Sequence, residues 1–130
     1  MADYTHKNVL EVENVAERFG YGELQESRFA HRDFETEQTG FSLHRIKPGK
    51  RQPFAHKHDE AEEIYFVVAG SGRIKIEDEV RELRPFDAVR LSAGVFRSLE
   101  AGAEGLDVLA FGPRRADDRG ELIQGWWADD

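Results

Sequence analysis

The chain has 130 residues, enough for one domain with a hydrophobic core. It carries 18 lysines and arginines against 26 aspartates and glutamates. The resulting formal net charge of -8 argues against nucleic acid and anionic membranes as partners, because both select a cationic surface. With no cysteine, the sequence excludes disulfide bonds, thiolate metal sites and iron–sulfur clusters.

No targeting or membrane signal is visible in the sequence. The first residues, Met1 to His6, lack the charged-then-apolar pattern of a signal peptide. No apolar run approaches the roughly 20 residues that a membrane-spanning helix needs. We therefore expect a soluble protein of the cytoplasm with no membrane partner.

A short helix is expected near the N-terminus, on the outside of the main body. Apolar residues recur there at helical spacing, and Gly20 follows them as a C-cap. The residues on this face are Val12, Val15, Ala16 and Phe19.

Residues 23–112 read as a series of short strands. Turn signals such as Lys47-Pro48-Gly49 and Gly70-Ser71-Gly72 recur every eight to fifteen residues, a rhythm typical of an antiparallel sandwich or barrel. No long helical pattern lies between them, which argues against a parallel βαβ fold. Ile64 to Ala69 is apolar at nearly every position, so we expect both faces of that strand to be covered.

The last segment, residues 113–130, has a different composition. A charged loop is followed by Trp126 and Trp127. We expect this C-terminal tail to be docked on the barrel, because leaving two tryptophans in water forfeits a few kcal/mol of burial.

Two histidines two residues apart, His56 and His58, are candidate metal ligands. Residues i and i+2 of a strand point to the same side, so both imidazoles would face one space. Glu63 could reach this space from the next strand. Two nitrogens and one carboxylate suit a divalent iron, manganese, nickel or zinc ion.

A glycine, the two histidines, the glutamate and a later glycine recur here at a distinctive spacing: Gly49, His56, His58, Glu63 and Gly70. This pattern resembles the first sequence motif of the cupin superfamily. The resemblance spans roughly residues 38–112. It implies an all-β, double-stranded β-helix, a jelly-roll-like barrel of about eight core strands. Because small cupins commonly dimerise, it also implies a homodimer.

The second cupin motif is only partly present. Gly94 is kept, but Phe86 and Ser92 replace the motif's first glycine and its proline, and Arg97 stands where a histidine ligand is expected. Arginine has no acceptor lone pair and cannot replace that ligand.

Three interpretations of Arg97 follow. A metal could bind to His56, His58 and Glu63 with Arg97 outside the ligand set or holding an anionic ligand. Arg97 could instead pair with Glu63 and take the place of the metal. In the third interpretation the histidines have no function and the barrel is an interaction module.

Other side chains are expected near the histidines. Phe54 shares strand parity with His56, and Tyr65 with Glu63, so both are candidates for the pocket wall. His44, in another predicted strand, could supply the missing nitrogen, although a structural role is favoured. Gln52 could donate a hydrogen bond there or lie in a loop.

The sequence thus predicts a small-molecule-binding protein, with an anionic ligand favoured by Arg97. Its alternatives are a metal-dependent oxygenase or isomerase, and a non-catalytic interaction module with a vestigial pocket. The predicted pocket residues are His56, His58, Glu63, Arg97, Phe54 and Tyr65, of which His56, His58 and Glu63 are the metal ligands.

Overall fold

The computed structural model describes residues 2–115 and 117–127, and within them the chain is nearly all β. One 3₁₀ helix, η1, spans Val9–Glu11. The strands are β1 (Gln25–Phe29), β2 (Thr39–Ile46), β3 (Phe54–His58), β4 (Glu63–Ile76), β5 (Glu79–Leu83), β6 (Ala88–Leu91), β7 (Arg97–Pro113) and β8 (Gly120–Gln124). This confirms the all-β expectation. No helix among the described residues is long and apolar enough to cross a membrane.

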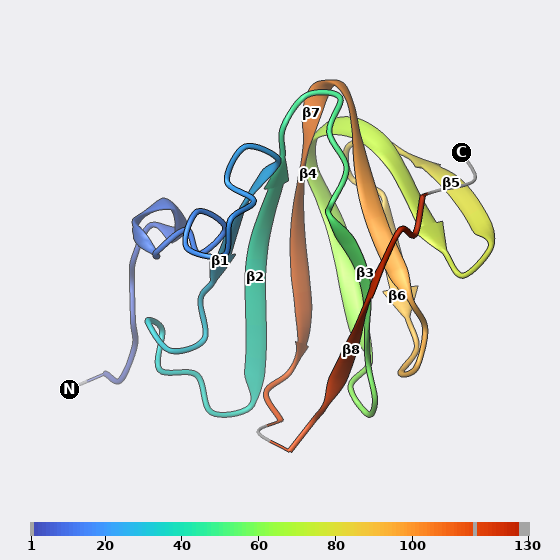
Figure 1. Cartoon of the computed structure of the whole chain (residues 1–130). Helices are drawn as coiled ribbons and strands as arrows, with labels where there is room; N and C mark the ends of the chain where they lie inside the picture. The colour runs from blue at the N-terminus through green and yellow to red at the C-terminus, as the bar shows by residue number, and fades with distance from the viewer. Residues whose placement is uncertain (1, 116, 128–130) are drawn as a thin grey trace.

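Helical structure at the N-terminus is smaller than expected. Beyond η1, residues 15–20 form a single turn that ends at Gly20, whose φ of 88° lies in the left-handed region that favours glycine. The side chain of Asn14 accepts hydrogen bonds from the amides of Ala16 and Ser27. Val15 also donates its amide to the carbonyl of Ser27. The bonds to Ser27 tie the segment to β1, beside which it lies in Figure 1.

The strands pair antiparallel throughout and curl into one eight-stranded sheet. The order β1-β2-β7-β3-β8 forms one path, and β4 pairs with β5, β6 and β7. The long strands β4 and β7 run side by side along most of their length and join the parts of the sheet (Figure 1). Register shifts between Val67 and Ala69 and between Gly70 and Gly72 mark bulges, which bend a strand and let the sheet curl. A Cβ at Gly70 would overlap the carbonyl oxygen of Gly105, so only glycine fits there.

The core lies inside this curl. Tyr65 and Val67 of β4 are buried, while Ile64 and Val68 on the other face are each 43% exposed. The expectation that both faces of this strand are covered is therefore met on one face only. Self-association through the exposed face stays a prediction. The largest buried cluster comprises Ile46, Tyr65, Val67, Ile74, Leu83, Leu91, Leu99, Ala101, Leu106, Val108 and Ala110.

Phe86 keeps the backbone shape of the glycine that it replaces in the cupin pattern. Its φ is 73°, in the left-handed region that a side chain with a Cβ rarely adopts. The turn before β6 is therefore retained although its glycine is not.

The C-terminal segment is docked on the barrel, as expected, and residues 120–124 of it form a strand. β8 pairs with β3 from Phe54 opposite Gln124 to His58 opposite Gly120. Trp127 is 6% exposed, and its indole Nε1 donates to the Oγ of Ser98 at 3.1 Å. Trp126 donates its Nε1 to the carbonyl of Lys75 at 3.0 Å. Both tryptophans thus hold the end of the chain on β4 and β7.

Replacing Trp127 by alanine should lower the free energy of unfolding by about 3–5 kcal/mol, since it leaves a cavity and removes the bond to Ser98. Urea denaturation followed by circular dichroism measures this change. The matched control is Tyr4→Ala, because Tyr4 is 78% exposed. Equal effects of the two substitutions would show that the tryptophan is not an anchor.

Candidate metal centre

The two histidines and Glu63 meet at one place inside the barrel. β3 carries His56 and His58 on the same side, and Glu63 is the first residue of β4. One ligand atom from each of the three side chains lies within 4.8 Å of the others. The two imidazole rings stand nearly perpendicular, with an interplanar angle of 87° and 5.5 Å between their centroids. The donor set is the one that the spacing in the sequence predicts.

His58 is oriented by a carboxylate from the C-terminal segment. Its Nδ1 lies 3.1 Å from Oδ2 of Asp118, while its Nε2 lies 3.7 Å from Oε2 of Glu63. Asp118 is itself fixed, because its Oδ1 accepts the amide of Glu60 at 2.8 Å. Burial raises the pKa of Asp118, but the backbone amides of Glu60 and Ala61 and the neighbouring His58 outweigh it and lower the pKa. With Nδ1 engaged, Nε2 is the His58 nitrogen available to a metal.

Arg97 lies behind Glu63 and is fully buried. Its guanidinium donates to Oε1 of Glu63 and, at 3.0 Å, to the carbonyl of Val95. It also lies over the ring of Tyr65, 5.6 Å from the centroid. Glu63 therefore gives one oxygen to Arg97 and turns the other toward His58. The pairing of Arg97 with Glu63 is the contact expected in the second interpretation. The other carboxylate oxygen, directed toward His58, is what the first interpretation requires. Both interpretations therefore stay predictions.

Burial and positive charge keep the buried imidazoles neutral. Burial, followed by the charge of Arg97, lowers the pKa of His56 to about 2. The same two causes, in the same order, lower the pKa of His44 to about 4. Burial likewise raises the pKa of Tyr65 to about 12, so its hydroxyl keeps its proton. A neutral imidazole is the form that binds a metal.

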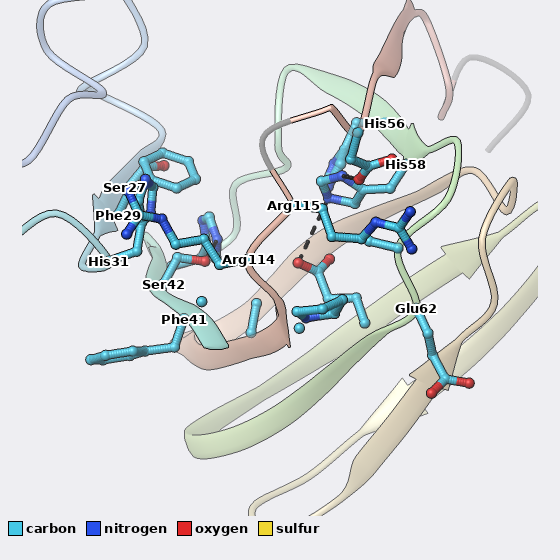
Figure 2. A pocket seen from close by; sticks show the side chains of 18 of the residues that line it. Ser27, Phe29, His31, Phe41, Ser42, His56, His58, Glu62, Arg114 and Arg115 are labelled. Carbon is cyan, nitrogen blue, oxygen red and sulfur yellow. Dashed lines mark hydrogen bonds and ion pairs between the residues drawn. The ribbon is translucent and has the colours of Figure 1, made fainter. Parts of the chain in front are cut away.

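The donor set borders a cavity of about 590 Å³, drawn in Figure 2. Of the six predicted pocket residues, Phe54, His56, His58 and Glu63 line it. Arg97 and Tyr65 do not line it; they lie beneath the wall and support Glu63. The cavity is the size of a small-molecule site.

His44 and Gln52, both possible pocket residues from the sequence, line the cavity, and Oε1 of Gln52 accepts the amide of Leu99 at 3.0 Å. Other lining residues had no clear signal in the sequence. Asp118 lies in the charged loop, where nothing distinguishes it from its neighbour Asp117. Gln25 and Ser27 alternate along β1 as buried polar residues, a signal that becomes readable only when the inward face of β1 is known.

The neutral histidines make stability depend on pH. In the unfolded chain a histidine titrates near 6.5, whereas His44 and His56 have folded pKa values of about 4 and about 2. Below about pH 6.5 the unfolded chain therefore binds more protons than the folded one, and the free energy of unfolding falls as pH drops toward about 4. Each histidine contributes a slope of up to about 1.4 kcal/mol per pH unit.

Urea denaturation at a series of pH values, in the presence of a chelator, measures this slope. His44→Phe should flatten it in the window from about pH 6.5 to about 4, and His6→Ala, at an exposed position, should not. An unchanged slope in His44→Phe would contradict the assignment of a neutral buried imidazole.

Solved structures of proteins named for different activities have a similar fold. A cupin protein from Bacteroides fragilis is 23% identical, with 90% of this chain and 89% of that chain covered and a TM-score of 0.70. A sugar phosphate isomerase of the cupin superfamily from Silicibacter pomeroyi is 20% identical, with 75% and 64% covered and a TM-score of 0.66. An oxalate decarboxylase from Bacillus subtilis is 22% identical, with 84% and 30% covered and a TM-score of 0.67. The comparison with curated proteins found no match.

A protein-family model, described as a cupin domain, matches residues 42–109. The match covers more than half of the chain and includes both histidines, Glu63 and Arg97. It agrees with the curled antiparallel sheet and with the similarity to solved cupin structures. The chain therefore belongs to the cupin family.

Proposed function

We propose that this protein binds a divalent metal through His56, His58 and Glu63 and uses it to hold a small anionic molecule in the cavity. The observation that carries the proposal is the convergence of the three donors within 4.8 Å at the wall of an open cavity. Two imidazoles and one carboxylate suit iron, manganese, nickel or zinc and leave coordination positions for a ligand. Such a metal would polarise an oxygen of the bound molecule and offset its negative charge.

Each donor is held in the state that a metal requires. His56 is neutral because partial burial, followed by the charge of Arg97, lowers its pKa. Asp118 engages Nδ1 of His58 and leaves its Nε2 directed toward Glu63. Arg97 restrains Glu63 through one carboxylate oxygen and leaves the other for the site. In this proposal Arg97 positions Glu63. Other cations of the cavity lining contact the anionic ligand.

The other cations are arginines in the cavity lining. Arg32, Arg114 and Arg115 all line it. Burial, followed by the charges of Arg114 and Arg32, lowers the pKa of His31, which indicates a positive potential at this part of the wall. The lining as a whole balances these three arginines with the carboxylates of Glu62, Glu63 and Asp118. The potential that favours an anionic group is therefore confined to the part of the wall beside Arg32 and Arg114.

A metal-dependent isomerase is the second candidate. The fold match to a protein named as a sugar phosphate isomerase, over 75% of this chain, favours it. An interaction module with a vestigial pocket is disfavoured, because the cavity is open and its lining includes the three donors. Turnover of a ligand would distinguish an enzyme from a binding protein.

Reconstitution of metal-stripped protein tests the centre directly. After incubation with Fe²⁺, Mn²⁺, Ni²⁺ or Zn²⁺ and removal of free ion, elemental analysis should find about one ion per chain for at least one metal. His56→Ala, His58→Ala and Glu63→Gln should each lose the bound ion, because the two remaining protein ligands hold a metal too weakly. His6→Ala should keep it. The proposal fails if no metal is retained, or if the three variants retain it as well as the wild type does.

Asp118→Asn tests the orientation of His58. The amide cannot accept the ring proton as strongly as the carboxylate, so metal affinity should fall about 10–100-fold while the fold is kept. The neighbouring substitution Asp117→Asn is the matched control, because the side chain of Asp117 is 75% exposed. Competition with a fluorescent chelator gives both dissociation constants. Equal affinities in the two variants would remove Asp118 from the site.

A further inference from the structure

A second group of polar side chains lines the cavity on strands that do not carry the metal donors. The group lies on β1 and β2, which pair antiparallel with Ser27 opposite His44. Its members alternate along each strand and therefore share the inward face. They are Gln25, Ser27, Ser42 and His44, all buried and all in the cavity lining. Figure 2 shows Ser27 and Ser42 on one side of the pocket and His56 and His58 on the other.

This polar wall leaves two hydrogen-bonding atoms unused. Gln25 donates its Nε2 to the Oγ of Ser27 at 2.5 Å, and the Oγ of Ser42 lies 2.8 Å from Nε2 of His44. Oε1 of Gln25 and Nδ1 of His44 then have no hydrogen-bond partner among the described residues. Gln25 is only 2% exposed and His44 only 8%. Buried polar atoms are nearly always paired in folded proteins, so these two atoms, on side chains that line the cavity, lack the partner that such atoms usually have.

The chemistry of the two atoms selects a hydroxyl group. Oε1 of Gln25 can only accept a hydrogen bond, which excludes a carboxylate or phosphate oxygen as its partner. Nδ1 of the neutral His44 donates or accepts according to the tautomer, and a hydroxyl can serve either. An ammonium group is disfavoured, because burial, followed by the charge of Arg97, opposes positive charge at this wall and lowers the pKa of His44.

We propose that the polar wall is a subsite for a polyhydroxylated small molecule, whose hydroxyls bind Oε1 of Gln25 and Nδ1 of His44. The neutral wall contrasts with the arginines and the metal donors elsewhere in the lining. The ligand therefore combines a hydroxylated part with an anionic group. The subsite rests on the proposed small-molecule pocket but does not require the metal.

The test compares carboxylates that differ only in their hydroxyls: glycerate with propionate, threonate with butyrate, ribonate with pentanoate, and gluconate with hexanoate. Isothermal titration calorimetry measures each dissociation constant on the wild-type chain, with and without Mn²⁺. The metal-free series isolates the wall, because hydroxyls can also chelate a metal. At least one hydroxylated member should bind tenfold or more tightly than its partner in both series.

Two variants assign the preference to the named atoms. Gln25→Met removes Oε1 at similar volume, and His44→Phe keeps a ring without nitrogens. Each should reduce the preference, taken as the ratio of the two dissociation constants within a pair, at least threefold. Gln38→Met, the same change at an exposed position outside the lining, should keep it. Thermal unfolding verifies that each variant is folded.

The outcomes separate this inference from the proposed metal centre. If no pair shows the preference in the wild type, the polar wall is not a hydroxyl subsite, whether or not Mn²⁺ binds. A preference that survives in folded Gln25→Met and His44→Phe also overturns it. If the preference is found but no metal binds, the metal centre fails and the subsite stands.

Discussion

The buried ion pair between Arg97 and Glu63 is the constraint on which the site depends. A guanidinium removed from water costs several kcal/mol unless it is paired and its donors are satisfied. Here Glu63, the carbonyl of Val95 and the ring of Tyr65 surround it. The pair joins the first residue of β7 to the first residue of β4. It therefore sets both the position of the carboxylate and the local packing of the two longest strands.

The same cation acts on the rest of the cavity through its charge. Arg97 is a cause of the lowered pKa values of both His44 and His56, although these side chains belong to different strands. Burial, followed by this one buried charge, thus keeps both imidazoles neutral. In the proposed metal centre, Arg97 would not be a ligand, but its charge would favour the neutral form of His56.

The sequence predicts the parts of this protein that are local in the chain. Strand parity and the cupin spacing place His56, His58 and Glu63 together because these residues lie on adjacent elements. Asp118 joins them only because β8 pairs with β3, a long-range contact without a sequence signal. The direction of Arg97 and the inward face of β1 depend on register, which parity leaves undetermined. The helix expected from the apolar residues 12–19 is reduced to turns, and this segment is held to β1 by contacts with Ser27 that the sequence does not signal.

The pairing of β3 has a consequence for how the chain acquires its shape. Its hydrogen-bonded neighbours are Arg97 of β7 and residues 120–124 of β8, both much later in the chain. Such distant contacts form slowly, because the entropy of closing a long loop is lost before the contact contributes favourable energy. On a ribosome the histidine strand therefore emerges well before either partner exists. Its backbone hydrogen-bonding groups stay unpaired with β8 until that strand has been synthesised. Asp118, just before β8, can contact His58 only at that late step.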